Sequence, residues 1–147
     1  MAKQSRIRQK SRFDFSQLSP GFEFPAESYI LDESTIKDYL QATGDNSNLY
    51  RQRSLAPPLA VAALAMAALS EKITLPPGTI HVSQELVFCG MVFAGDRITC
   101  SSKVSRKVDR GGLRLMSTDI TVTNQDGKTV LTGKVGFVLP DMEKISG

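Results

Sequence analysis

PPLAVAALAMAALSE, at residues 57–71, is the stretch that decides the fold of this chain. Two prolines suit the first turn of a helix, because their fixed φ is already helical and their missing N–H has no acceptor there. The apolar residues that follow leave the helix without a polar face, so other elements must enclose it. The apolar run from Leu55 to Leu69 is shorter than the roughly 20 residues that cross a bilayer, and we expect no membrane span.

Strand and turn patterns lie on both sides of this helix. Upstream, residues 22–32 alternate as a strand, Ser34 caps a short helix that ends near Thr43, and Gly44 opens a polar loop that reaches residue 56. Downstream, four strands are expected, at residues 79–93, 97–107, 113–124 and 129–139. Ala-Gly-Asp at 94–96 and Asp-Gly at 126–127 predict hairpin turns between these strands.

This element order predicts one α+β domain, in which a curved antiparallel sheet wraps around the apolar central helix. A length of 147 residues fits a single domain, and 41% hydrophobic residues are enough to form its core. We place the domain at residues 21–141. A flexible basic tail at 1–20 precedes it, and a short tail at 142–147 follows it.

The positive charge of the chain is concentrated at its beginning. The net charge is +3, and five basic residues precede the first acidic residue, Asp14; they are Lys3, Arg6, Arg8, Lys10 and Arg12. The remainder is therefore close to neutral, which argues against a nucleic-acid-binding domain. Contact of the tail with RNA or a membrane and a mitochondrial targeting role are alternatives to a solvated tail, but the tail has no apolar face.

The chain has two cysteines and one histidine, and their spacing is not that of a metal site. Cys89 and Cys100 fall in consecutive predicted strands, so they could be neighbours, but we expect buried free thiols in a cytoplasmic protein. His81 stands alone at the start of a strand, where a structural or exposed role is expected. We therefore expect neither a metal nor another cofactor.

Three motifs occur in the order and spacing of a known family. They are Ala-Thr-Gly-Asp-Asn-Ser-Asn-Leu-Tyr at 42–50, Ala-Pro-Pro at 56–58 and Phe-Ala-Gly-Asp at 93–96. With the element order, they make the chain from about Phe22 to Pro140 resemble the hot-dog fold of the MaoC-like (R)-specific enoyl-thioester hydratases and dehydratases. The resemblance implies dimers whose sheets join edge to edge. It also implies a site for an acyl thioester, of coenzyme A or acyl carrier protein, between the pre-helix loop and the start of the central helix.

The resemblance also supplies candidate site residues. Active members carry Asp-x-Asn-Pro-x-His in the pre-helix loop, and a glycine N–H at the helix start binds the developing oxyanion. This chain keeps the aspartate as Asp45, but Ser47, Asn48 and Tyr50 replace the asparagine, the proline and the histidine. At the helix start, Pro57-Pro58 replaces His-Gly and removes the N–H. We assign Asp45 and Tyr50 as candidate catalytic residues, and Asn48, Pro57 and Pro58 as candidate substrate-binding residues.

These departures resemble the non-catalytic half of double-hot-dog dehydratases, or the corresponding subunit of heterodimeric ones. A tyrosine hydroxyl, with a pKa of about 10, is a poor base at neutral pH, although it can donate a proton. Our first hypothesis is therefore an acyl-thioester-binding subunit or degenerate homodimer with weak or no activity alone. In a heterodimer, a catalytic hot-dog partner would supply the aspartate and the histidine.

Two alternatives stay open. One is an autonomous hydratase or thioesterase that uses Asp45, although the acids that a thioesterase would need, Glu71 and Glu85, lie at the far end of the helix and on a strand. The other is a dimeric scaffold without catalytic function. Each site residue also has a plainer interpretation: Asp45 as a loop-amide acceptor, Tyr50 as a packing residue, and Arg51 and Arg53, which might otherwise meet coenzyme phosphates, as solvated.

Overall fold

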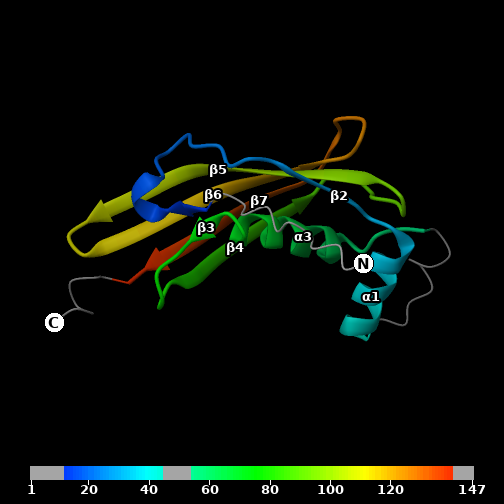
Figure 1. Ribbon diagram of the computed structural model, residues 1–147, viewed down its shortest axis with the longest axis horizontal. Helices are drawn as coiled ribbons and strands as arrows, with labels where there is room; N and C mark the ends of the chain where they lie inside the picture. Colours follow the sequence, from blue (N-terminus) through cyan, green and yellow to red (C-terminus); the bar gives the residue numbers. More distant parts are fainter. Residues whose placement is uncertain (1–11, 45–53, 141–147) are drawn as a thin grey trace, which may run out of the picture.

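The computed structural model describes residues 12–44 and 54–140. Its elements follow one another as β1 (Phe13–Asp14), η1 (Phe15–Gln17), β2 (Glu27–Ile30), α1 (Glu33–Thr43), α3 (Pro58–Ser70), β3 (Ile73–Thr74), β4 (Ile80–Phe88), β5 (Arg97–Arg110), β6 (Leu113–Thr123) and β7 (Thr129–Leu139). Figure 1 shows α3 lying along one face of a curved sheet, with α1 near one end of that helix. The predicted α+β architecture, a curved antiparallel sheet around an apolar helix, is confirmed.

The main sheet has five strands in the order β2-β5-β6-β7-β4, and each pair of neighbouring strands is antiparallel. The hairpin predicted at 126–127 joins β6 to β7, and Gly127 supplies the positive φ of 74° that this turn requires. The hairpin predicted at 94–96 is wrong. A tight turn does form there, with the Asp96 amide donating to the Phe93 carbonyl, but β4 pairs with β7 and the chain crosses the end of the sheet to reach β5.

The packing of α3 against the sheet uses small side chains. Ala60, Ala62, Ala65 and Ala68 are buried together with Val61 and Leu69. On the sheet, alternate residues of β6 face them, from Met116 to Val122, all buried. Because alanine adds little bulk, the helix axis can come close to the sheet while the larger strand residues fill the space between them.

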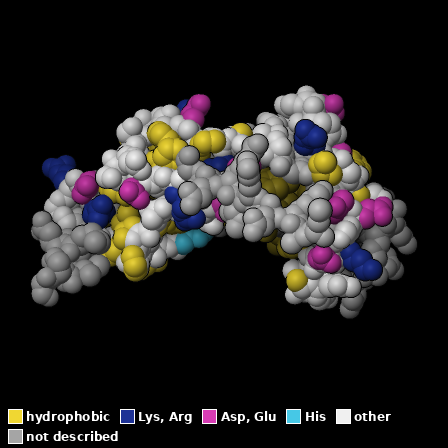
Figure 2. Space-filling view, viewed as in Figure 1, with side chains coloured by type: hydrophobic (Ala, Val, Ile, Leu, Met, Phe, Trp, Pro, Cys, Tyr) yellow, Lys and Arg dark blue, Asp and Glu magenta, His cyan; other side chains and the backbone are white. Residues whose placement is uncertain are grey.

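The enclosure predicted for α3 is incomplete within one chain. Leu59 is 60% exposed, and Ala63 and Ala67, which follow it at intervals of four residues, are also exposed. An apolar stripe along the helix therefore faces outward. No helix in the described residues is long and apolar enough to span a bilayer. On the face shown in Figure 2, basic side chains of the described residues are interspersed with acidic ones.

Two sequence predictions upstream of α3 need correction. The cap of α1 is Asp32 rather than Ser34, because the Asp32 carboxylate accepts the Thr35 amide and hydroxyl, and these bonds lower its pKa. The strand predicted at 22–32 is shorter, since β2 covers only Glu27–Ile30. The Phe24 amide still bonds to β5, but Pro25 has no N–H to continue the ladder.

The segment at 12–20, which we assigned to a flexible tail, is an ordered part of the domain. Phe15 and Leu18 are buried in the core, and β1 pairs in parallel with β3. The ammonium of Lys107 donates to the carbonyls of both residues, each at 2.8 Å, and lies 4.3 Å from the Phe15 ring centroid. The ordered domain therefore begins before residue 20, where we had placed the end of the tail. The sequence did not indicate this, because the core residues Phe15 and Leu18 stand among basic and polar residues.

Two cations, the exposed Arg12 and the buried Lys72, lie at the C-terminal end of α3. Arg12 donates from Nη2 to the Ser70 and Ile73 carbonyls, at 3.3 and 2.9 Å. Lys72 is 3% exposed, its ammonium donates to the Pro25 carbonyl, and it lies 3.8 Å from a Glu27 carboxylate oxygen. Arg12 thus satisfies carbonyls near the C-terminus of the helix, where positive charge is favourable, whereas Lys72 ties this end to the segment before β2.

The two cysteines are free, as predicted, but only Cys100 is buried, whereas Cys89 is exposed. Burial raises the pKa of the Cys100 thiol to about 11, against an ordinary value of 9.0, and the nearby Lys72 opposes this shift only in part. Because the folded state holds its proton at higher pH than the unfolded state does, this group makes unfolding easier as pH rises from about 9 to about 11.

We expect iodoacetamide at pH 8 to modify Cys89 in the native protein and to leave Cys100 unmodified until the chain unfolds, because the reagent reaches only the exposed thiol and burial raises the pKa of the Cys100 thiol. Mass spectrometry of the intact protein measures the number of adducts. The Cys89→Ser variant serves as the control and is expected to gain none. Native-state labelling of that variant would show that Cys100 is accessible.

The Thr118 hydroxyl is buried, with no hydrogen-bond partner among the described residues, and the residue is 0% exposed. Replacement of a buried, unpaired hydroxyl by a methyl group of similar shape removes a desolvation cost. We expect Thr118→Val to raise the free energy of unfolding by about 1 kcal/mol, as measured by urea denaturation. Thr121→Val, on the opposite face of β6, is the control and is expected to change stability by less; a loss of stability in Thr118→Val would show that the hydroxyl is satisfied.

Candidate functional site

The predicted site residues fall into two groups. Asp45, Asn48 and Tyr50 lie outside the described residues, as do Ser47, Arg51 and Arg53, so their assignments stay predictions. Pro57 and Pro58 are described and lie where the sequence placed them, at the start of α3. Pro57 is the N-cap and is buried, whereas Pro58 occupies the first helical position and is exposed.

The structure fixes both ends of the 45–53 segment. On one side, α1 ends at Gly44, which has the left-handed φ of 68°. On the other side, Leu55 bridges Phe93, and the Ala56 amide donates to the Val92 carbonyl at 2.8 Å. This short pairing holds the chain that enters α3 against the segment that leaves β4.

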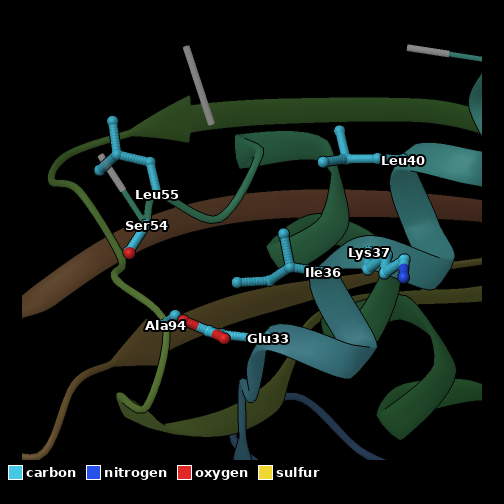
Figure 3. A pocket seen from close by; sticks show the side chains of 7 residues that line it. All are labelled: Glu33, Ile36, Lys37, Leu40, Ser54, Leu55 and Ala94. Atoms are coloured by element: carbon cyan, nitrogen blue, oxygen red, sulfur yellow. The ribbon is translucent and has the colours of Figure 1, made fainter. Parts of the chain in front are cut away.

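A cavity of about 330 Å³ lies between α1 and the chain that enters α3. Figure 3 shows Ile36 and Leu40 of α1 on one side, with Leu55 and Ala94 among the residues across from them. Glu33, Lys37 and Ser54 complete the lining. Ser54, the first described residue after the 45–53 segment, is part of this lining.

A second cavity, of about 260 Å³, lies against the first turn of α3. Its described lining is wholly apolar, with Pro58 and Val61 from the helix and Phe88 and Met91 from the end of β4 and the segment after it; Leu55, Ala56, Gly90, Val92 and Val130 complete it. Such a cavity suits a hydrocarbon chain and offers no described side chain for polar recognition. We call it the first-turn cavity.

The first turn of α3 has a reduced set of amide donors. Pro57 and Pro58 have no N–H, and the amides of Ala60 and Val61 donate back to the Pro57 carbonyl at 2.9 and 3.4 Å. The first N–H of the helix therefore belongs to Leu59, one residue and about 100° further around the helix than Pro58. The resemblance places the oxyanion donor of the family at Pro58, and a proline has no N–H to donate there.

A third cavity, of about 390 Å³, lies at the other end of α3 and β4. It is lined by Met66 and Leu69 of the helix and by His81 and Phe137 of the sheet, and Arg12, Ser70, Ile73 and Leu75 complete its lining. His81 is the second residue of β4 and is exposed, as predicted, and its ring centroid lies 5.4 Å from that of Phe137. We call this cavity the last-turn cavity.

The acids considered for a thioesterase lie away from the first-turn cavity. Glu71 is the C-cap of α3, at the opposite end of the helix. Glu85 lies on β4 between Gln84 and Leu86, so its side chain points to the face of the sheet opposite the one that Gln84 and Leu86 share. The described residues contain no cluster of three or more His, Cys, Asp or Glu side chains that could hold a metal ion.

Sequence reasoning missed most of the lining of the first-turn cavity. Val61 lies within the predicted helix, and Phe88, Met91 and Val130 lie within predicted strands, but no sequence motif indicates that they share a cavity. The sequence feature that could have indicated this lining is the spacing of bulky residues among the alanines of the helix. What faces Val61 across the cavity depends on the pairing of β4 with β7, whereas the sequence predicted a hairpin between β4 and β5.

Solved structures of similar shape include (R)-hydratases and a dehydratase complex. R-hydratase PhaJ1 from Pseudomonas aeruginosa aligns with a TM-score of 0.72 and 23% identity, over 86% of this chain and 84% of that one. The (R)-hydratase from A. caviae involved in PHA biosynthesis gives 0.70 and 18%, over 84% and 98%. The 3R-hydroxyacyl-ACP dehydratase complex HadBC from Mycobacterium tuberculosis gives 0.61 and 20%, over 81% and 96%. At these identities the likeness establishes the hot-dog fold.

A search of curated protein sequences finds no match. A family model described as the FAS1-like dehydratase domain region matches residues 19–133, which is more than half of the chain. The match includes α3, the chain that enters it and the main-sheet strands up to the middle of β7. It agrees with the MaoC-like resemblance found in the sequence motifs. The chain therefore belongs to the FAS1-like, MaoC-like dehydratase family of hot-dog proteins.

Proposed function

We propose that this chain binds acyl thioesters, of coenzyme A or acyl carrier protein, as a hydratase/dehydratase-type protein with weak or no turnover alone. The observation that carries the proposal is the first-turn cavity, whose described lining is entirely apolar and which opens beside a helix start without N–H groups. An acyl chain would occupy the cavity, and the thioester would lie beside Pro58.

Two chemical losses support weak turnover. The Pro58 position has no N–H, and removal of a single oxyanion donor typically costs a factor of about 10² to 10³ in rate. In the sequence, Tyr50 stands where the histidine base is expected, and a positioned general base typically contributes a factor of about 10² to 10⁴. Asp45 alone then lacks both of the groups that would assist it.

Dimerisation and location are parts of the same proposal. The apolar stripe on α3 and the exposed edge of β4 favour association with a second hot-dog chain, since apolar surfaces of this kind mark protein interfaces. HadBC, a complex, has the same fold at a TM-score of 0.61. Two free cysteines are in keeping with a cytoplasmic location.

We expect the purified chain to bind crotonyl-CoA but to hydrate it at least about 10³-fold more slowly than an active (R)-hydratase, because the oxyanion donor and the histidine are both replaced. Calorimetry measures binding, and loss of absorbance of the enoyl thioester measures hydration. PhaJ1 is the positive control for turnover. Efficient hydration that disappears in Asp45→Asn would refute the weak-turnover proposal, and undetectable binding for acyl chains of several lengths would favour a scaffold.

The first-turn cavity itself can be tested through Met91, which is 66% exposed and lines the cavity. We expect Met91→Glu to weaken acyl-thioester binding about tenfold or more, because it places a carboxylate against the acyl chain. Leu113→Glu is the matched control, since Leu113 is 49% exposed and begins β6, outside the lining of the cavity. Equal affinities in the two variants would place the acyl chain elsewhere.

A further inference from the structure

The turn at residues 93–96 is closed by two hydrogen bonds that run in opposite directions. The Asp96 amide donates to the Phe93 carbonyl at 3.0 Å, and the Phe93 amide donates to Oδ2 of the Asp96 carboxylate at 2.9 Å. Hydrogen bonds to an ionised acceptor are stronger than those between neutral groups. The half-buried side chain of Asp96 therefore holds this turn in one shape.

Two backbone hydrogen bonds join this part of the chain to the segment that enters α3. The Ala94 amide donates to the Ser54 carbonyl at 2.6 Å, and the Ala56 amide donates to the Val92 carbonyl at 2.8 Å. Ser54 has the left-handed φ of 53°, which a residue other than glycine keeps only where its surroundings fix it. The bond from Ala94 is one such contact, so the position of Ser54 depends on the turn.

The carboxylate of Asp96 supplies an acceptor that this pairing does not provide. Leu55 and Phe93 face each other between the two backbone bonds, as an antiparallel pair that exchanges no hydrogen bonds of its own. The Phe93 amide therefore points away from the segment that enters α3 and toward Oδ2 of Asp96. Without the carboxylate, this N–H would have no acceptor among the described residues.

Gln125, in the turn between β6 and β7, binds the other oxygen of the carboxylate. Its Nε2 donates to Oδ1 of Asp96 at 3.1 Å, and its Oε1 accepts the Arg97 amide at 3.2 Å. A backbone N–H can only donate, so the Arg97 amide fixes which end of the Gln125 side chain faces Asp96. The turn, the start of β5 and the β6–β7 connection are therefore joined through one carboxylate and one amide.

Two cavities lie against the residues that these bonds hold. Val92 lines the first-turn cavity, together with Leu55 and Ala56 of the segment that enters α3. Ala94 lines the cavity beside α1, together with Ser54 and Leu55 (Figure 3). A shift of the turn would therefore move walls of both cavities.

We propose that Asp96 is a positioning residue for acyl-thioester binding. Through the turn, its carboxylate sets where the segment that enters α3 lies, and this segment forms part of the wall of the first-turn cavity. The carboxylate acts through the turn rather than on the thioester, because both of its oxygens accept hydrogen bonds from protein donors. The role in binding rests on the proposed function, and the experiments below separate the two.

An exchange of carboxylate and amide between positions 96 and 125 tests this role. In Asp96→Asn, the new amide oxygen accepts the Phe93 amide, so its NH2 group faces the NH2 group of Gln125. In Gln125→Glu, two carboxylates face each other. In the double variant Asp96→Asn/Gln125→Glu, the new NH2 group donates to the new carboxylate, whose other oxygen accepts the Arg97 amide. Every hydrogen bond of the network is then restored, with donor and acceptor reversed between the two side chains.

We expect each single variant to raise the Kd for crotonyl-CoA about tenfold, because like groups then face each other, and the double variant to return it to within about twofold of the original. Calorimetry measures the Kd at a temperature at which circular dichroism shows every variant to be folded. Asp119→Asn is the matched control. It loses the same charge, but Asp119 is paired with Lys134 at 3.9 Å and lies outside the lining of both cavities, so its Kd is expected to stay unchanged.

Amide hydrogen exchange, measured by NMR without a ligand, tests the hold of Asp96 on the segment that enters α3. We expect the Ala56 and Ala94 amides to exchange at least about tenfold faster in Asp96→Asn and to return to their original rates in the double variant, because these two donors make the joining bonds. The Met116 amide, on the buried face of β6, is the control and is expected to keep its rate.

The two measurements separate the possible outcomes. A Kd that Asp96→Asn does not raise, or that the double variant does not restore, would overturn the role of Asp96 in binding. Unchanged exchange at Ala56 and Ala94 would overturn its hold on the segment that enters α3. If exchange responds and recovers as expected but the unsubstituted chain binds no crotonyl-CoA, the proposed function is refuted, while the hold of Asp96 on that segment stands.

Discussion

The close approach of α3 to the sheet is the constraint on which the rest of the structure depends. Alanines on the buried face of the helix let it lie near β5 and β6, so the larger strand residues supply most of the volume of the core. A helix with bulkier residues on that face would stand further away and leave the sheet flatter. The cavities at its two ends and the exposed stripe along it all follow from this position.

The two ends of α3 are chemically different. At its C-terminus, Arg12 donates to two carbonyls, and the nearby Lys72 binds the Pro25 carbonyl, so this end is tied to the N-terminal segment. At its N-terminus, two prolines remove donors, and an apolar cavity takes the place of a polar contact. One end of the helix is thus held by basic side chains, whereas its first turn faces an apolar cavity.

Incomplete enclosure links the fold to its proposed partner. A single chain covers α3 on the sheet side but leaves an apolar stripe on the helix and an apolar edge on β4. Association with a second hot-dog chain, as proposed above, would bury such apolar surface.

The sequence by itself determined the architecture and the family. An apolar helix with prolines at its start, the alternating strands after it and the motifs around it were enough, because local periodicity fixes which elements form. The sequence predictions were wrong where contacts between segments far apart in the chain decided the structure. The turn at Gly95 is real, yet β4 pairs with β7, and the segment from Arg12 to Leu18 is ordered because Lys107, some 90 residues later, binds its carbonyls. Only the tertiary structure decided what lines the first-turn cavity, since Val61, Phe88 and Val130 meet through sheet topology, which leaves no local signal in the chain.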